Sequence, residues 1–439
     1  MTLSQYLHLD ARRKGDRSTA HSQPVVLLAA TVWWPLSARL AVALVRAGCV
    51  VKAICPPGHP LHYVRGTNKI YDYRRIDSLA ALEDAIRDAR PDMIVPCDDG
   101  AVWQLHDLYE LKNDLRALIV RSLGSAGAYA TIRSRGHFLA AAAELGVRVP
   151  QTQILDSEQQ LAAWWTQPST SAVLKLDGTW GGTGVAIAQS KEQGLEAFRN
   201  MKRPSGMSLA IKRSLVNRDP LALWAWRKKV KPAVCIQEFI AGRPANTMFL
   251  AHQGTLLSIV TVEVLCAQGM TGAATVVRVI QNDEIKDAAT VIAQRFELSG
   301  FHGLDFILEE ATGGAYLIEM NPRCTQLGHL QLEGQGDLAE ALYTQLSGAA
   351  PSPSPDSIQG DTIAFYPQAS AWNPENPYLL TGHHDVPWEE PELAHELLRE
   401  SWPDRQWTAR IYHRFRAPKR DESVDFKDLA SVPSRSAIR

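Results

Sequence analysis

The sequence predicts an α/β fold spread over more than one domain. Its 439 residues leave room for two to four domains. Near the N-terminus, short apolar runs alternate with helical patterns, which is typical of a parallel sheet covered by helices on both faces. From residue 246 onward apolar strands instead follow one another. Hydrophobic residues make up 45% and charged residues 21% of the chain, which excludes a mainly disordered or fibrous protein.

The charges of the chain are almost balanced. Lys and Arg number 46 and Asp and Glu number 47, for a net charge of -1. This balance argues against a protein that coats nucleic acid or an anionic membrane, so we expect neither as a partner. The apolar stretch 25–51 contains Arg39 and Arg46, which are costly at membrane depth, so we do not interpret it as a membrane span.

Two further features bear on location. Residues 1–22 are polar and lack the apolar core of a secretory signal, so we expect a flexible arm. The six cysteines form neither a CxxC pair nor the spacing of a zinc site. Buried free thiols are typical of a reducing compartment, and we therefore expect a cytoplasmic protein.

The elements near the N-terminus are predicted from short apolar runs and helical spacing. Strands are expected at 23–30, 49–54 and 93–96, with helices at 37–47 and 79–89. Functional groups of such sheets gather beyond the carboxyl ends of the strands. The segment Cys97-Asp98-Asp99-Gly100 follows the last of these strands. A substrate-facing loop and an N-cap for the next helix are equally good interpretations of it.

The middle of the chain mixes both kinds of element. Helices are expected at 134–145 and 284–296, strands at 172–176 and 232–240, consecutive strands over 246–280, and a hairpin of 303–308 with 316–320. The Pro-Ser repeat at 351–355 has the composition of a linker.

One predicted hairpin loop is rich in glycine. It follows Lys175 and contains Gly178, Gly181, Gly182 and Gly184 between two apolar strands. Backbone N–H groups without neighbouring side chains can wrap phosphate oxygens, and the lysine adds a cation. It is not a Walker A loop, because neither Gly-Lys-Ser/Thr nor a helix follows. Taken alone, a phosphate-binding loop and a mobile hairpin are equally good interpretations.

Two carboxylates and an amide are predicted to meet on the 303–320 hairpin. Asp305 and Glu319 are 14 residues apart across a short turn, so antiparallel pairing brings them together. Strand alternation places Glu319 and Asn321 on the same face, with Arg323 beyond. These oxygens suit Mg²⁺, which usually also binds phosphate oxygens. A salt-bridged strand pair at the surface is the alternative, and the metal interpretation is favoured.

A third motif completes a recognisable set. The strand 232–240 ends in Glu238, which is followed by a glycine turn at Gly242. Alone this motif is weak. In combination, the order and spacing of the three motifs resemble those of the ATP-grasp ligases of the carboxylate–amine type. That superfamily includes D-alanine–D-alanine ligase, biotin carboxylase and carbamoyl phosphate synthetase, and the resemblance covers roughly residues 121–345.

The resemblance implies the complete fold class. It is an α/β protein with an N-terminal Rossmann-like pre-ATP-grasp domain, a two-lobed α+β ATP-grasp fold and a C-terminal extension. The expected boundaries are 23–115, 116–350 with a lid lobe at about 150–245, and 351–439. We expect the extension to pack on the core up to about Phe415, because it is too small for an independent core, and to end in a loose tail from about residue 416.

The resemblance also implies which residues bind the phosphates of ATP. Lys175 would bind the α- or β-phosphate, and Gly181, Gly182 and Gly184 would close over the β- and γ-phosphates. Relatives often carry a lysine in the preceding helix, where this chain has Arg135. This arginine replaces that lysine at the phosphates, or it is a solvated residue at a helix start.

The adenosine part of ATP is assigned in the same way. Glu238 would lie at the adenine hinge, with backbone groups of Phe239, Ile240 and Ala241 facing the adenine edge. Asn246 occupies the position at which relatives often contact the ribose.

The resemblance assigns Asp305, Glu319 and Asn321 to one or two Mg²⁺ ions, with Mn²⁺ as a substitute. Asp305 stands where glutamate is common, so the metal is expected to bind mainly through Glu319. Arg323 is the expected catalytic residue, because it would stabilise the transferred phosphoryl group or the acyl phosphate. His329 and Arg278 are interpreted first as structural and surface residues, with substrate contacts as the alternative.

The implied activity is an ATP-dependent carboxylate–amine ligase. A carboxylate would attack the γ-phosphate to give an acyl phosphate and ADP, and an amine would then displace phosphate to give an amino-acid or peptide-like product. Both substrates are small molecules, and the resemblance leaves a homodimer open. One alternative is a carboxyphosphate-forming enzyme of the carboxylase or purine type, which would use bicarbonate. A further alternative is an inactive nucleotide-binding scaffold.

Overall fold

A parallel sheet forms the N-terminal domain of the computed structural model. The structure describes residues 23–74, 76–165, 171–178, 184–202, 233–332, 336–350, 358–406 and 423–425. The strands are β1 (Val25–Ala29), β2 (Val50–Cys55), β3 (Lys69–Asp72) and β4 (Met93–Pro96), in the order β3-β2-β1-β4. All neighbouring pairs are parallel, which confirms the fold class predicted for this region.

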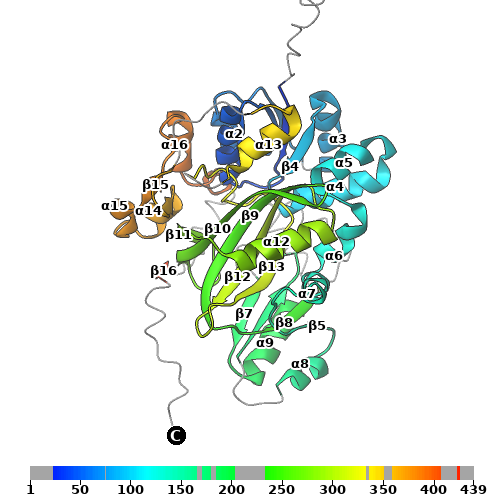
Figure 1. The fold of residues 1–439 in the computed structure, drawn as a ribbon, viewed down its shortest axis with the longest axis vertical. Coiled ribbons are helices and arrows are strands. Elements are labelled where there is room, and N and C mark those ends of the chain that lie inside the picture. Colours follow the sequence, from blue (N-terminus) through cyan, green and yellow to red (C-terminus); the bar gives the residue numbers. More distant parts are fainter. Residues whose placement is uncertain are drawn as a thin grey trace, which may run out of the picture.

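Helices cover both faces of this sheet (Figure 1). Side chains alternate along β1, so Val26 and Leu28 pack in the cluster that contains α2 (Leu36–Ala47). Leu27 and Ala29 pack in the cluster formed with α3 (Ser78–Ala89) and α4 (Asp99–Leu111). Burial on both faces explains why these strands read as continuous apolar runs. The remaining elements of this part are η1 (Pro60–Tyr63), η2 (Asn113–Leu115), α5 (Arg116–Leu123), η3 (Ala126–Ala128) and α6 (Tyr129–Arg133).

A small antiparallel sheet follows in the chain, in the order β5-β8-β6-β7. Its elements are α7 (Arg135–Glu144), β5 (Thr152–Leu155), α8 (Glu158–Trp164), β6 (Ala172–Leu176), β7 (Val185–Ala188), α9 (Lys191–Lys202) and β8 (Val234–Glu238). Leu161 of α8 and Phe198 of α9 pack against Leu174 and Ile236 on one face of this sheet. Together with α8 and α9 it forms the small lobe at the lower end of Figure 1.

A large sheet joins the two ends of the molecule, in the order β13-β12-β9-β10-β11-β14-β15, with β16 paired to β10. Its strands are β9 (Gly242–His252), β10 (Thr255–Gln268), β11 (Ala274–Val279), β12 (Gly300–Glu309), β13 (Ala315–Asn321), β14 (Thr362–Phe365), β15 (His383–Asp385) and β16 (Ser423–Asp425). Phe249 faces α12 (Asp283–Arg295), whereas Met248 and Leu250 face the cluster that includes α2 and α13 (Leu338–Ser347). Strand alternation thus gives the sheet two buried faces.

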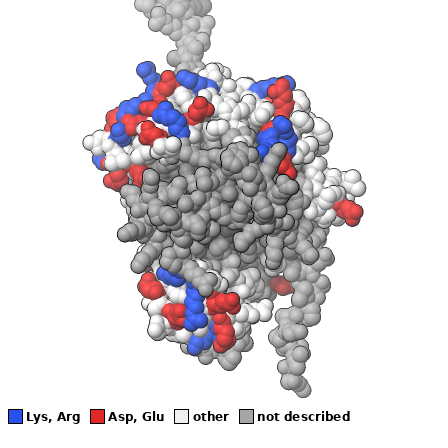
Figure 2. All heavy atoms as spheres, turned by 180° about the vertical axis from the view of Figure 1, so that it is seen from behind, with Lys and Arg blue, Asp and Glu red and all other residues white. Residues whose placement is uncertain are grey.

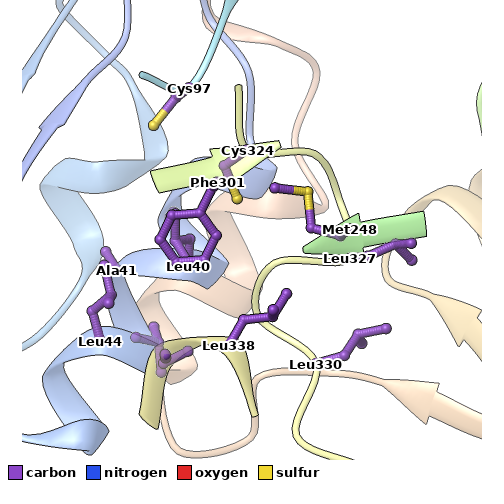
Figure 3. Packing of buried hydrophobic residues seen from close by; sticks show 14 of the residues in the cluster. Leu40, Ala41, Leu44, Cys97, Met248, Phe301, Cys324, Leu327, Leu330 and Leu338 are labelled. Atoms are coloured by element: carbon purple, nitrogen blue, oxygen red, sulfur yellow. The ribbon is translucent and has the colours of Figure 1, made fainter. Parts of the chain in front are cut away.

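One hydrophobic core connects the N-terminal domain to the large sheet. Figure 3 shows Leu40 and Leu44 of α2 near Phe301 of β12, with Met248 of β9 and Leu338 of α13 in the same cluster. Phe301 and Met248 are almost completely buried. Because a shared close-packed core resists displacement of its parts, these elements hold each other in a fixed arrangement.

The C-terminal extension is built into the same sheet. β14 pairs antiparallel with β11, and β15 pairs with β14. The remaining helices are α14 (Gln368–Trp372), α15 (Tyr378–Thr381), α16 (Pro391–Leu397) and α17 (Trp402–Arg405). Leu393 and Leu397 of α16 enter the core shared with α2. The tail predicted from residue 416 lies outside the described residues, apart from the three residues of β16.

Charges are mixed on the described surface. In the view of Figure 2, Lys, Arg, Asp and Glu side chains intermingle at the end of the N-terminal domain and at the end of the small lobe. No helix among the described residues has the length and apolar character that a membrane crossing requires. All six cysteines are buried and free of disulfides.

Candidate functional site

A cavity of about 420 Å³ lies between the small sheet, the large sheet and the carboxyl ends of the N-terminal strands. Of the proposed site residues in the described chain, nearly all line it. They are Arg135, Lys175, Glu238, Phe239, Ile240, Asn246, Asp305, Glu319, Asn321 and Arg323. Side chains from positions far apart in sequence therefore converge on one space, which is the usual arrangement of a ligand site.

Strand register brings three of these side chains into one row. On the β9–β12 pair Asn246 lies opposite Asp305, and on the β12–β13 pair Asp305 lies opposite Glu319. Asn321, two residues beyond Glu319, is paired with Gly303 and faces the same cavity. The antiparallel pairing expected from the sequence is therefore present.

Asp305 is held by two amides. Asn246 Nδ2 donates to Oδ1 at 2.6 Å, and Asn321 Nδ2 donates to Oδ2 at 3.0 Å. Burial and the neighbouring Glu319 carboxylate raise the pKa of Asp305 to about 6. Asn246 was expected at the ribose, but its amide is committed to Asp305 in this structure.

Glu319 is surrounded by cations. Arg135 Nη2 lies 2.6 Å from its Oε1, and the same guanidinium lies 3.5 Å from Asp177. Burial alone would raise the pKa of Glu319, but Arg135 and Lys175 outweigh burial, so this pKa is lowered. The interpretation of Arg135 as a solvated helix-start residue is wrong, because its side chain is only 8% exposed and points into the site.

Lys175 lies on β6 and points across the cavity toward β13. Its Nζ donates to the carbonyl oxygen of Ile318 at 3.3 Å. Burial lowers the pKa of Lys175 to about 8, although Glu319 opposes this shift. The side chain is thus a desolvated cation aimed at the carboxylate row.

The glycine loop is described only at its ends. Lys175 of β6 pairs with Val185 of β7, so the predicted hairpin is present, and Leu176 N–H donates to the Gly184 carbonyl. Gly178 lies at φ 74°, a conformation that favours glycine, and lines the cavity. Gly181 and Gly182 lie outside the described residues.

The expected adenine hinge follows β8. Glu238, Phe239 and Ile240 line the cavity, with the Phe239 ring 38% exposed. The Phe239 N–H already donates to the carbonyl of Ser171 at 3.3 Å. Ala241 does not line the cavity, and its carbonyl accepts from Glu310 N–H at 3.0 Å. The adenine contact stays a prediction, and of the four residues expected there only Ala241 lies outside the cavity lining.

Arg323 connects the carboxylate row to the N-terminal domain. Its Nη2 donates to Asn321 Oδ1 at 3.3 Å, and its Nε lies 3.3 Å from Asp99 Oδ2. Burial alone would lower the pKa of Arg323, but Asp99 and Asp98 outweigh it, so this pKa is raised. The guanidinium stays charged at any working pH.

The two aspartates that follow β4, Asp98 and Asp99, have different contacts. Asp98 is the N-cap of α4: its Oδ1 accepts from Ala101 N–H at 2.9 Å, and its Oδ2 from Thr31 N–H at 2.6 Å. Asp99 faces the cavity. The N-cap interpretation of the Cys97–Gly100 segment is thus confirmed for Asp98, whereas the substrate-facing interpretation stays a prediction for Asp99.

The donor set fits a divalent cation. Asp305 and Glu319 present carboxylates at paired register positions, and a cation bound there would favour the charged form of Asp305, which burial and Glu319 disfavour. The Asn321 amide oxygen is a third hard ligand at this edge. Among the described residues, no group of three or more His, Cys, Asp or Glu side chains could hold a metal, so the set at this site is two carboxylates and one amide.

Sequence reasoning missed several lining residues, namely Trp34, Trp103, Arg133, Asp177 and Gln237. Trp34 follows β1 and Trp103 lies on α4, so both project from the carboxyl edge of the parallel sheet. Functional groups gather beyond the carboxyl ends of parallel strands, and this rule, which pointed to Asp99 after β4, applies equally to Trp34 after β1. Tryptophan offered no separate signal, because aromatic residues are usually core residues.

Two residues considered as substrate contacts have other partners. Arg278 forms an ion pair with the buried Glu263. His329 Nε2 bonds Asp385 at 2.8 Å, which supports the structural interpretation of this histidine.

Comparison with known proteins identifies one domain. A family described as an ATP-grasp domain matches residues 137–326, which include every predicted metal and phosphate residue except Arg135. A search of curated proteins finds no match.

Solved structures share the fold at low sequence identity. N5-carboxyaminoimidazole synthetase from Staphylococcus aureus, complexed with ADP, is 16% identical, covers 75% of this chain and 79% of its own, and has a TM-score of 0.53. The biotin carboxylase domain of Hydrogenobacter thermophilus 2-oxoglutarate carboxylase is 13% identical. The match covers 76% of this chain and 72% of that domain, with a TM-score of 0.53. Phosphoribosylamine–glycine ligase from Thermotoga maritima is 16% identical. The match covers 76% of this chain and 78% of that chain, with a TM-score of 0.51.

Proposed function

Because residues 137–326 match the ATP-grasp domain family, we propose that this chain is an ATP-dependent ligase that joins a carboxylate to an amine. The carboxylate oxygen attacks the γ-phosphorus of ATP, the bond to the β,γ-bridging oxygen breaks, and ADP leaves. The amine nitrogen then attacks the acyl carbon, loses a proton and displaces inorganic phosphate. One C–N bond forms for each ATP consumed.

The observation that carries this proposal is the convergence of opposite charges on the cavity. Asp305, Glu319 and Asn321 would hold Mg²⁺, which neutralises phosphate charge when it is bound. Lys175 and Arg135 present buried cations beside them for phosphate oxygens. Such groups are fixed before substrate arrives, so little reorganisation opposes the reaction.

Arg323 is proposed to act on the reacting groups. It lies beyond the carboxylate row, toward the N-terminal domain, and is 14% exposed. A permanent cation there would stabilise the phosphoryl group in transfer and the acyl phosphate that results. No covalent nucleophile of the protein is needed, and burial raises the pKa of the nearby thiol Cys324 to about 12, which keeps it protonated.

The test is ADP release over a panel of amino acids and small carboxylates, offered singly and in pairs with Mg²⁺. A carboxylate ligase releases ADP fully only when donor and acceptor are both present. Release driven by bicarbonate without any other carboxylate would instead identify a carboxyphosphate-forming enzyme. No release with any combination would contradict the proposal.

A further inference from the structure

The cavity extends past the carboxylate row to the topological switch point of the N-terminal sheet. The order β3-β2-β1-β4 reverses direction between β1 and β4, and ligands of open α/β sheets bind beyond that point. Trp34 follows β1 and Asp99 follows β4, and both line the cavity. Cys324 N–H donates to the Pro96 carbonyl at 3.1 Å, which fixes the end of β13 against the end of β4.

This fixed contact sets two opposite charges side by side. The Asp99 carboxylate and the Arg323 guanidinium form an ion pair at 3.3 Å, with side-chain exposures of 22% and 14%. The buried Arg323 Nε has no hydrogen bond of good geometry, since its contact with Asp99 is only an ion pair. Within the part of the chain that the structure describes, Arg323 is the one residue that pairs with the Asp99 carboxylate. Both groups therefore keep free capacity toward the cavity.

The cavity that contains this pair is lined largely by apolar groups. Trp34, Trp103, Leu327 and Met270 are among them, and Met270, in the β10–β11 turn, is 49% exposed. Arg133 lies over the Trp103 ring at 5.5 Å, so that ring already has a cation on one face. Burial of an apolar ligand group against Trp34 and Met270 would release water from both.

We propose that this end of the cavity is the subsite for the carboxylate substrate, and that the substrate is an α-amino acid with a large apolar side chain. Its carboxylate binds Arg323, its ammonium binds Asp99, and its side chain packs against Trp34 and Met270. The inference rests on the proposed function, since it names the substrate that the ligase activates.

The orientation follows from the position of the two charges. Arg323 bonds Asn321 of the carboxylate row, whereas Asp99 belongs to α4 on the far side. A zwitterion that pairs with both places its carboxylate next to the proposed phosphate and metal site and its ammonium away from it. The reverse orientation would set like charges against each other.

The first experiment measures binding without turnover, by titration calorimetry of the full chain with Mg²⁺ and a non-hydrolysable ATP analogue. The probes are both enantiomers of phenylalanine, 3-phenylpropionate without the ammonium, phenethylamine without the carboxylate, and alanine without the ring. Each probe that lacks one of these groups should bind about 10-fold or more weakly than the better phenylalanine enantiomer. The reason is that it has lost a charged hydrogen bond or the buried ring.

The second experiment assigns the contacts to residues. Asp99→Asn should weaken phenylalanine binding about 10-fold or more and leave 3-phenylpropionate binding the same, because only the former has an ammonium. Trp34→Ala should lower the preference for phenylalanine over alanine about 10-fold. Glu110→Gln, on the exposed end of α4, and Trp388→Ala, with 79% exposure, are the matched controls and should change neither.

The possible outcomes distinguish a failure of the subsite proposal from a failure of the ligase proposal. No binding of the nucleotide analogue by the wild-type chain would contradict the proposed function and this inference with it. If the nucleotide binds but 3-phenylpropionate binds as tightly as phenylalanine, the subsite is wrong while the ligase proposal stands. Should Asp99→Asn not fold, as judged by its thermal unfolding, the wild-type comparison of the probes decides alone.

Discussion

Glu319 is the residue on which most of the site depends. It lies opposite Asp305, bonds Arg135 at 2.6 Å and is the carboxylate that opposes the pKa decrease of Lys175. Asp305 has a pKa of about 6, whereas the pKa of Glu319 is lowered, so Glu319 would keep its charge longer as the pH falls and would be the stronger ligand of the proposed metal. Glu319 thus lies between the proposed metal and the two cations, Arg135 and Lys175, that are proposed to bind phosphate.

Glu319→Gln should lower ADP release at saturating Mg²⁺ by about 100-fold or more, since outer-shell partners of metals already contribute 10- to 100-fold. The amide keeps the shape of the side chain, but Arg135 retains only the Asp177 carboxylate, at 3.5 Å, so the variant should stay folded at the assay temperature and unfold at a somewhat lower temperature in EDTA. Glu310→Gln, at the exposed end of the same hairpin, is the matched control. Normal turnover by Glu319→Gln would rule out the metal assignment.

Lys175 makes a pH-dependent prediction. Its pKa of about 8 in the free protein means that half of the ammonium groups are neutral at pH 8. A bound polyanion favours the charged form, so ATP binding at pH 8 to 8.5 should take up a fraction of a proton, and ATP affinity should fall as the pH rises further. Calorimetry in buffers of different ionisation enthalpy measures this uptake.

Lys175→Met should abolish the proton uptake and weaken ATP binding. Lys175 is buried, with 5% of its surface exposed. Methionine retains the buried stem, so the free energy of unfolding should change little. Equal proton uptake by wild type and variant on ATP binding would contradict the assignment of Lys175 to the proposed phosphate site.

At the scale of elements, the C-terminal extension is held by a buried ion pair. Asp385 of β15 lies 2.5 Å from Arg39 of α2 and 2.8 Å from His329, and all three side chains are buried. Burial alone would raise the pKa of Asp385, but Arg39 and His329 outweigh burial and lower it to about 2. The contact joins the N-terminal domain, the loop after β13 and the extension.

Asp385→Asn should lower the free energy of unfolding by about 3–5 kcal/mol at pH 7, because Arg39 keeps its charge without a partner. A depressed carboxyl pKa gives stability that is complete above the unfolded value near 4 and lost as the pH falls through 2. Urea unfolding at pH 7 and pH 3 should therefore show a smaller difference between variant and wild type at pH 3. A difference below 1 kcal/mol at pH 7, as expected for the exposed Asp84→Asn, would contradict the prediction.

Elements with a strong local pattern could be predicted from the sequence, and elements defined by distant partners could not. β1, β4 and the β12–β13 hairpin are apolar runs with turn signals, and they form where expected. β3 was missed because this edge strand, Lys69–Asp72, is exposed at both ends. The three residues of β15 carry no strand pattern, since their pairing with β14 depends on tertiary contacts. The ion pair of Asp99 and Arg323 joins residues 224 positions apart, so spacing gave no hint of it.

At the scale of the whole molecule, the extension should not separate from the rest. β14 completes the large sheet beside β11, and α16 enters the core around α2. Limited proteolysis between residues 350 and 358 should therefore give two fragments on a denaturing gel and one species on gel filtration. Two separately folded species after cleavage would show that the extension is an independent module.

The central claim is that this molecule activates a carboxylate with ATP, and the fate of the carboxylate oxygen tests it most directly. The full chain is incubated with ATP, Mg²⁺ and a mixture of amino acids and small carboxylates labelled with ¹⁸O, and the inorganic phosphate is analysed by mass spectrometry. An acyl phosphate leaves one labelled oxygen in each phosphate when the amine displaces it, and Glu319→Gln should release about 100-fold less labelled phosphate. Unlabelled phosphate from the wild-type protein, in the presence of normal ADP release, would contradict the account.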